Sequence, residues 1–486
     1  MERRAFLRSV MGTALSRLVG GCSGEPFFAA RVTVSREHAG RMVPTDFVGL
    51  SYESAVLAQG NFFAPYNESI LNLMRLLGRS GVIRIGGNTS ERTVWRSDDH
   101  SVADHKNFVI TPAAIDRLAG ALRSLDWQLI YGLNLARGRP DEAAAEAAYV
   151  ANAVGPRLLA FQIGNEPDGF GQWTKVRSSS YDVEAYLNEW SLFQAAIDER
   201  VPNARFAGPD VTTGSDWMNR FAAVKPHGLT LLTQHYYADG PAGAWHVTLA
   251  NLMRSSARAV PLLGRLRLIS REYGLPYRIV EANSVFNEGQ PGVSDTLGAA
   301  LWGLELMSQV AIAGGAGINF HAGVNNHHPE RDKAYTPIAR GENDNYRAAP
   351  LYYGMLMFAI AGRGRLVPTQ IVPEHSELCA FACDEDGSLR VCLINKDPTR
   401  PARLTIVPDG GFYEHASVLR LMGPSIDSIS GVTLGGAAVD DAGRWLPIVE
   451  EISNPENAEI VIGVEPSSAA LIQISSNRGN DKFPML

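Results

Sequence analysis

Two glutamates, Glu166 and Glu281, each end a short apolar run of the chain. Pro167 follows Glu166 directly and has no backbone N–H for a sheet, so a strand is expected to stop there. Hydrolysis of an acetal needs a proton for the leaving oxygen and a negative group behind the anomeric carbon. Two carboxylates supply both, and at a separation of about 5–5.5 Å one of them attacks directly and the configuration is retained. The pair therefore predicts glycoside hydrolysis.

Polar residues elsewhere in the chain have side chains that a sugar site can use. Asn165 can hydrogen-bond a sugar 2-hydroxyl, a contact that strengthens in the transition state. Arg84 can keep Glu281 ionised, and the phenol of Tyr237 can steady that carboxylate. Each candidate also has an ordinary structural alternative: an ion pair for Arg84, a packed aromatic for Tyr237, a satisfied core histidine for His235 and a loop acid for Glu53.

Eight apolar runs must position these residues. They alternate with segments whose apolar positions recur three or four residues apart, as in 69–78, 111–125, 140–154 and 181–200. Strands that are apolar on both faces and alternate with helices indicate a parallel sheet, and eight such units indicate a closed (β/α)8 barrel over residues 46–360. The expected strands are 47–53, 82–88, 128–134, 158–166, 205–210, 231–238, 278–283 and 317–323.

Catalytic groups of such a barrel lie at the carboxyl ends of its strands. Glu166 ends the fourth expected strand and Glu281 the seventh, so we expect them to face each other across the barrel mouth. The same rule selects the candidates Glu53, Asn88, Asn134, Asn165, Glu166, Asp210, His235, Tyr236, Tyr237, Glu281 and His321.

The last quarter of the chain, residues 361–486, has a different pattern. Short β-type segments replace the helices, and turn residues separate them, which is typical of an antiparallel β-sandwich. A strand within residues 29–45 also alternates and is expected to join this sandwich. The expected strands of the sandwich are 378–383, 389–394, 402–407, 416–421, 460–464 and 469–474.

Three of the four cysteines, Cys379, Cys383 and Cys392, fall in the expected sandwich. Cys379 and Cys383 are about 13 Å apart if they lie on one strand, which is too far for a disulfide. A bridge between Cys383 and Cys392 across the turn stays open, but free core thiols are the expectation. No Cys/His spacing predicts a zinc site, and we expect no metal and no cofactor.

Residues 1–28 predict export. Arg3 and Arg4 precede Phe6-Leu7, as in a twin-arginine signal, and the apolar run that follows is too short and too charged to span a bilayer. Residues 19–22 resemble a lipoprotein cleavage box, which leaves a lipid anchor at Cys22 open. We therefore expect a periplasmic or extracellular protein with no membrane-spanning helix.

The composition limits the partners. A formal net charge of −7 argues against a nucleic-acid-binding protein, which would need a basic face. With 45% hydrophobic and 20% charged residues the chain has the balance of an ordinary globular protein. The expected partner is a carbohydrate.

Several segments resemble family-79 glycoside hydrolases, the β-glucuronidases and heparanase-like enzymes. The wider clan of retaining barrel glycosidases shares two of these segments: Gly-Asn-Glu-Pro at 164–167 and the Val-Glu that ends at Glu281. Other segments resemble family 79 more specifically. They are the first two strands, 47–53 and 84–89, the His-Tyr-Tyr of 235–237, and the loop from the second glutamate to Thr296. The resemblance covers roughly residues 31–475.

The resemblance implies a role for each matching residue. Glu166 would be the acid/base and Glu281 the nucleophile, while Glu53, Asn165 and Tyr237 would contact the cleaved sugar. The family holds the sugar's carboxylate with backbone N–H groups of a glycine-rich loop after the nucleophile and with a tyrosine beyond the eighth strand. The corresponding residues here are Phe286, Asn287, Glu288, Gly289 and Tyr335.

This chain departs from the family in that loop. The family has an aromatic residue followed by glycines, whereas this chain has Asn287 and Glu288, and a glutamate beside a substrate carboxylate would weaken binding unless it points outward. The expected activity is that of an exo-β-glucuronidase. Three alternatives stay open: an endo-acting heparanase-like enzyme, a β-glycosidase for a neutral sugar such as a glucoside or xyloside, and a non-catalytic carbohydrate-binding protein.

Overall fold

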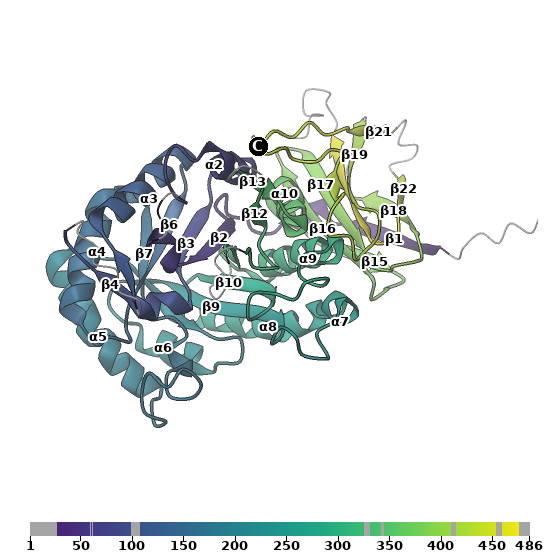
Figure 1. The fold of residues 1–486 in the computed structure, drawn as a ribbon. Helices are drawn as coiled ribbons and strands as arrows, with labels where there is room; N and C mark the ends of the chain where they lie inside the picture. Colours follow the sequence, from purple (N-terminus) through teal and green to yellow (C-terminus); the bar gives the residue numbers. More distant parts are fainter. Residues whose placement is uncertain are drawn as a thin grey trace, which may run out of the picture.

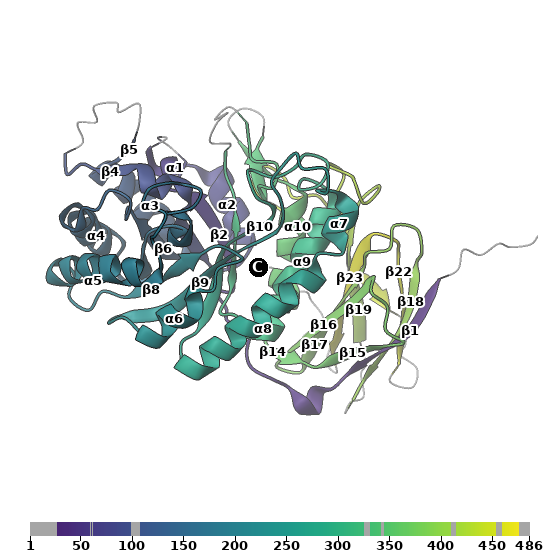
Figure 2. The same ribbon diagram turned by 90° about the horizontal axis from the view of Figure 1, so that it is seen from below.

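The computed structural model shows a barrel and, beside it, a pair of packed sheets (Figures 1 and 2). Residues 1–26, which hold most of the predicted export signal and Cys22, lie outside the described residues. Strand β1 begins at Phe28, the last position that was assigned to the signal. The structure describes residues 27–58, 60, 62–98, 107–324, 331–341, 345–409, 415–452 and 459–475.

Eight parallel strands close the barrel, in the order β10, β11, β2, β3, β6, β7, β8, β9. Their residues are almost all buried, because the barrel interior packs on one face and the surrounding helices pack on the other. The predicted (β/α)8 barrel is therefore confirmed. The strands are β2 (Val48–Glu53), β3 (Val82–Gly86), β6 (Gln128–Leu133), β7 (Leu158–Ile163), β8 (Phe206–Val211), β9 (Leu229–Asp239), β10 (Tyr277–Val285) and β11 (Ile318–His321).

Helices surround the barrel (Figure 1), and several of them start as ordinary capping rules predict. Pro112 and Pro140 occupy the first turns of α3 and α4, where a missing N–H costs nothing. The side chain of Asp182 caps α5 by accepting from the N–H of Ala185. The main helices are α2 (Glu68–Leu76), α3 (Pro112–Leu125), α4 (Pro140–Val154), α5 (Val183–Arg200), α6 (Trp217–Val224), α8 (Ser256–Tyr273), α9 (Leu297–Ala313) and α10 (Pro350–Ala361).

Helices α9 and α10 lie between the barrel and the sheets (Figure 2) and are buried on nearly every side, as their apolar composition requires. A buried ion pair ties the two parts together, because Lys396, just after strand β17 (Ser388–Asn395), lies 2.9 Å from Glu305 of α9. Among the helices of the described ranges, none combines the length and apolar character that a membrane span requires.

Two sheets pack face to face beside the barrel. One has the order β15, β1, β18, β22, and the other has the order β14, β16, β17, β23, β19, β20, with β21 paired to β19. All pairs are antiparallel except β1 with β18, which run parallel. The longer strands are β1 (Phe28–Val34), β16 (Leu378–Glu385), β17 (Ser388–Asn395), β18 (Ala402–Pro408), β19 (His415–Met422), β22 (Ile460–Val464) and β23 (Ser468–Ser475); the shorter are β14 (Arg365–Val367), β15 (Thr369–Val372), β20 (Thr433–Leu434) and β21 (Glu450–Ile452).

The cysteines of the described chain, Cys379, Cys383 and Cys392, are free thiols, as predicted. Cys383 lies opposite Arg390 and Cys392 lies opposite Phe381 in the pairing of β16 with β17, so the two thiols do not face each other across the strands. Burial raises the pKa of both thiols to about 12, which makes them inert core residues.

Candidate active site

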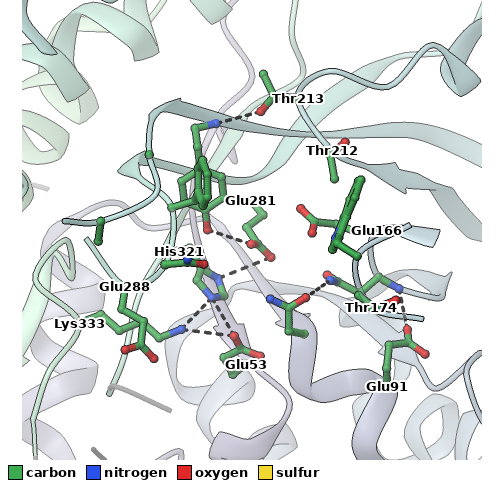
Figure 3. Close-up of a pocket in the computed structure, with 18 of the residues that line it drawn as sticks. Glu53, Glu91, Glu166, Thr174, Thr212, Thr213, Glu281, Glu288, His321 and Lys333 are labelled. Atoms are coloured by element: carbon green, nitrogen blue, oxygen red, sulfur yellow. Dashed lines mark hydrogen bonds and ion pairs between the residues drawn. The ribbon is translucent and has the colours of Figure 1, made fainter. Parts of the chain in front are cut away.

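The carboxyl ends of the barrel strands surround one cavity of about 1230 Å³ (Figure 3). Side chains of Glu53, Asn165, Glu166, Tyr237 and Glu281 line it together, although they come from different strand ends. Residues that were selected because they end barrel strands therefore meet at one site.

Glu166 is held at the end of β7 by its backbone. Its N–H donates to the carbonyl of Asp210, 2.9 Å away, and its own backbone is left-handed, with φ of 47°. A non-glycine residue in that conformation is strained, and such strain is common where a side chain must be aimed at a site. Burial raises the pKa of Glu166, and the neighbouring Glu281 carboxylate raises it further, so Glu166 is suited to carry a proton.

His235 connects Glu166 to a buried carboxylate. Its Nδ1 lies 2.9 Å from Oε1 of Glu166, and its Nε2 lies 2.9 Å from Oδ1 of Asp210. Burial alone would lower the pKa of His235, but the carboxylates of Asp210 and Glu281 outweigh it and raise the pKa well above its ordinary value. The ring is then a cation that donates to both carboxyl groups.

Glu281 has the opposite environment. Burial would raise its pKa, but His321, His235 and Arg84 outweigh this effect and lower the pKa to about 2. The carboxylate accepts hydrogen bonds from Nη1 of Arg84 and, at 2.9 Å, from the phenol of Tyr237. Glu281 is therefore an anion at every ordinary pH, as a nucleophile must be.

The two carboxyl groups are close and differ in protonation. One carboxylate oxygen of Glu166 and one of Glu281 lie within 4.8 Å of each other, and a ring nitrogen of His235 lies within the same limit of both. This separation is shorter than the roughly 6.5–9.5 Å of inverting glycosidases and close to the roughly 5–5.5 Å of retaining ones. The environments shift the two pKa values in opposite directions, so Glu166 is suited to carry a proton and Glu281 to stay charged.

Arg84 orders the floor of the site. Its guanidinium is fully buried and pairs with both Asp210 and Glu281. It also donates to Oδ1 of Asn165 at 2.7 Å and to Oε1 of Gln162 at 3.0 Å. A planar guanidinium with five N–H donors can satisfy all these acceptors at once, which a lysine could not do.

Known proteins resemble this chain over almost its whole length. A β-glucuronidase from Aspergillus niger is 25% identical, with 88% of this chain and 90% of the relative aligned, and a β-glucuronidase from Neurospora crassa is 24% identical over 85% and 90%. The structure of a 4-O-α-L-rhamnosyl-β-D-glucuronidase from Fusarium oxysporum superimposes with a TM-score of 0.76 at 21% identity, covering 92% of this chain and all of the other. No protein-family model matches.

With the paired carboxylates, these relatives decide the class. The chain is a glycoside hydrolase, and it is similar to the β-glucuronidases of family 79. An arabinofuranosidase structure with a TM-score of 0.67 and 14% identity shares the fold over 92% of this hydrolase.

A second cluster in the cavity of this hydrolase contains a residue that the sequence analysis missed. Lys333 follows β11 and is only 2% exposed; its Nζ lies 3.4 Å from Oε1 of Glu53 and 3.0 Å from Nε2 of His321 (Figure 3). The other oxygen of Glu53 accepts from the N–H and hydroxyl of Thr89. Lys333, His321 and Thr89 outweigh burial and keep the pKa of Glu53 well below its usual range.

The loop after the nucleophile keeps a glycine-like shape without the family's glycines. Asn287, Glu288 and Gly289 have φ values of 61°, 71° and 84°, so all three are left-handed. The carbonyl of Glu288 accepts from the N–H of Ala334, 2.8 Å away, and this bond ties the loop to the segment that carries Tyr335. Glu288 lines the cavity, so it does not point away from the site.

Two of the strand-end candidates, Asn134 and Tyr236, take no part in the site. Asn134 bonds the carbonyl of Thr93 and the N–H of Arg137, so it shapes the turn after β6. Tyr236 is buried against the surrounding helices, because successive residues of a strand point to opposite faces and its neighbours His235 and Tyr237 point inward.

Glu91 is a further residue that the sequence analysis missed. Its carboxylate accepts from the N–H groups of Asn165 and Ala136, each at 2.7 Å, and burial raises its pKa to about 7. It fixes the peptide just before Glu166. Its place just beyond β3, near the selected Asn88, was the only signal in the sequence.

Proposed function

We propose that this hydrolase is an exo-acting β-glucuronidase that removes glucuronic acid from glycans with retention of configuration. The observation that carries the proposal is the pair Glu166 and Glu281, whose oxygens lie within 4.8 Å and whose pKa values are shifted in opposite directions. The two β-glucuronidases that align with nearly the whole chain support the choice of sugar.

The reaction has two steps. Glu281 attacks the anomeric carbon, the bond to the leaving oxygen breaks, and Glu166 gives that oxygen its proton, which leaves a glycosyl ester on Glu281. Glu166, now a carboxylate, then takes a proton from a water, whose oxygen attacks the anomeric carbon and releases Glu281. His235 stabilises the Glu166 carboxylate that exists between the two steps, because its Nδ1 lies 2.9 Å from Oε1.

The substrate carboxylate requires positive or N–H-rich surroundings. The loop at residues 287–289 has left-handed backbone, and successive N–H groups of such a turn can cradle an anion. Tyr335 borders that loop, since its backbone lies against Gly289. Lys333 has three N–H bonds, and among the described residues two of them are directed at Glu53 and His321, so one more is available to a carboxylate.

A neutral β-glycoside is the second candidate substrate. Glu288 lines the cavity and adds a carboxylate where a uronic acid would bring another. A glucoside or xyloside would avoid that repulsion. Because Lys333 lines the same cavity and offsets this charge, we favour the uronic acid.

The place of action is inferred from the start of the chain. We infer export from the paired arginines Arg3 and Arg4 ahead of Phe6 and Leu7, with a lipid anchor at Cys22 as the alternative to a freely released protein. Release of a reporter fused behind residues 1–28 into the periplasm, and its loss on changing both arginines to lysine, would test this.

A panel of nitrophenyl β-glycosides tests the substrate. The glucuronide should be turned over far faster than the glucoside or xyloside. Turnover of the glucoside with none of the glucuronide would contradict the uronic acid assignment and support the second candidate.

A further inference from the structure

The cavity is larger than the sugar that is cleaved. Its volume of about 1230 Å³ exceeds the roughly 300–1,000 Å³ of pockets that enclose a drug-sized ligand. One pyranose ring in contact with Glu281 therefore leaves room for a further group. That group must lie on the side of Glu166, because Glu166 delivers its proton to the leaving oxygen.

Trp173 stands on that side, seven residues after Glu166. The N–H groups of Gln172, Trp173 and Thr174 all donate to the carbonyl of Gly169, at 3.1, 3.2 and 3.3 Å, so the turn that carries the indole is well fixed. The indole also lines the cavity and is 53% exposed, which is unusual for so large an apolar side chain held in place.

Gly169 sets the position of the indole. A Cβ at this residue would lie 2.3 Å from Cε2 of Trp173, so the ring packs directly on the glycine backbone. The protein thus supports the ring at Cε2, Cζ2 and Nε1, while about half of the side chain stays accessible. A rigid aromatic ring binds at a low cost in conformational entropy.

Hydroxyl groups line the same cavity as Trp173. Thr174, Thr212 and Thr213 line the cavity, and Figure 3 shows Thr174 and Thr212 beside Glu166, away from Lys333 and Glu288. Thr212 donates to Asp168 at 2.6 Å, which holds its side chain in place. An apolar ring and hydroxyls that line one cavity match a pyranose, which has an apolar C–H face and a rim of hydroxyls.

We propose that Trp173 is the platform of a leaving-group subsite that takes a second pyranose ring. The substrate is then a glycoside whose leaving group is itself a sugar, so that at least a disaccharide fills the cavity. The assignment rests on the proposed glycosidase function, but it does not depend on whether the cleaved sugar is acidic or neutral.

The test compares two substrates that share the cleaved sugar. Methyl β-glucuronide has a leaving group without a ring, whereas a β-glucuronosyl disaccharide fills the subsite. For Trp173→Ala, kcat/KM on the disaccharide should fall by about tenfold or more, whereas kcat/KM on the methyl glycoside should stay within about twofold. Trp173→Phe should recover most of the loss, and Gly169→Ala, which displaces the indole, should reproduce it.

Trp245 supplies a matched control, because it is 91% exposed, follows β9 and lies outside the cavity lining of the described chain. Trp245→Ala should leave kcat/KM unchanged on both substrates. Equal losses on the two substrates in Trp173→Ala, or no loss on either, would overturn the subsite. If wild type cleaves methyl β-glucoside and not the glucuronide, the uronic acid assignment fails separately, and the same comparison with glucosyl substrates decides the role of Trp173.

Discussion

His235 places its Nδ1 2.9 Å from Oε1 of Glu166 while its Nε2 meets the buried carboxylate of Asp210. Since the raised pKa of His235 keeps both ring nitrogens protonated, Oε1 of Glu166 can only accept. The acidic proton of Glu166 is then confined to Oε2. His235 thus acts on both the pKa and the proton position of Glu166, the proposed acid/base.

Replacing His235 by glutamine should therefore change the pH profile. His235 lowers the pKa of Glu166 through its hydrogen bond and its charge, so its loss raises that pKa further. Glu166 then stays protonated to higher pH, and the alkaline limb of kcat/KM should move upward. Maximal kcat should fall by about 10²-fold or more, because the Glu166 carboxylate loses its cation. His246→Gln, a half-exposed histidine after β9, should change neither quantity.

Arg84 should be needed for both stability and the acid limb. Arg84→Met leaves Asp210 and Glu281 buried without their guanidinium, which should lower the free energy of unfolding by about 3–5 kcal/mol. The pKa of Glu281 should rise from about 2, so activity should be lost at a higher pH on acidification. Urea unfolding and an acid-side rate profile measure the two effects.

Arg278→Met is the control for that substitution. Arg278 is also buried in a barrel strand, but it donates to Asn319 and to backbone carbonyls rather than to carboxylates. Its loss should leave the acid limb in place. An unchanged acid limb in Arg84→Met would contradict the role of Arg84 in holding Glu281 ionised.

Glu288 should weaken binding of an acidic sugar. Glu288→Gly removes a carboxylate from the cavity wall and suits the left-handed backbone, where φ is 71°. KM for a nitrophenyl β-glucuronide should fall several-fold, with little change in kcat. Asn287→Gly alters the same loop without altering charge, and it should not lower KM. A higher KM in Glu288→Gly would show that the carboxylate assists binding.

Lys333 should have the opposite effect. Lys333→Met removes the cation next to Glu53 and His321, so KM for the glucuronide should rise by about tenfold or more. Any residual turnover of the neutral glucoside should change less, and the ratio of the two kcat/KM values is the decisive measurement. A loss of equal size on both substrates would assign Lys333 to positioning Glu53 alone.

The sequence was sufficient for the barrel and for the meeting of Glu166 and Glu281 at its mouth. Eight apolar runs repeat with helical segments between them, and strand ends in a parallel barrel necessarily meet at one face. Tyr236 could also have been excluded, because alternation along β9 directs it away from His235 and Tyr237.

Lys333 could not be found in this way. It lies in an irregular connection after β11 with no periodicity, and its contact with Glu53 joins residues 280 positions apart. Glu288 shows the same limit, since its residue type predicted a change in the loop, whereas the left-handed shape of residues 287–289 was visible only in the structure.

Trapping the covalent intermediate tests the central claim most directly. A 2-deoxy-2-fluoro-β-glucuronosyl fluoride should inactivate the enzyme with one sugar per chain, and mass spectrometry of the digested protein should locate the sugar on Glu281. Glu281→Ala should take up no label, whereas Glu166→Gln should still be labelled, because a fluoride leaving group needs little help from an acid. A label on another residue, or turnover of glucuronides with inversion and no label, would contradict the assignment of Glu166 and Glu281.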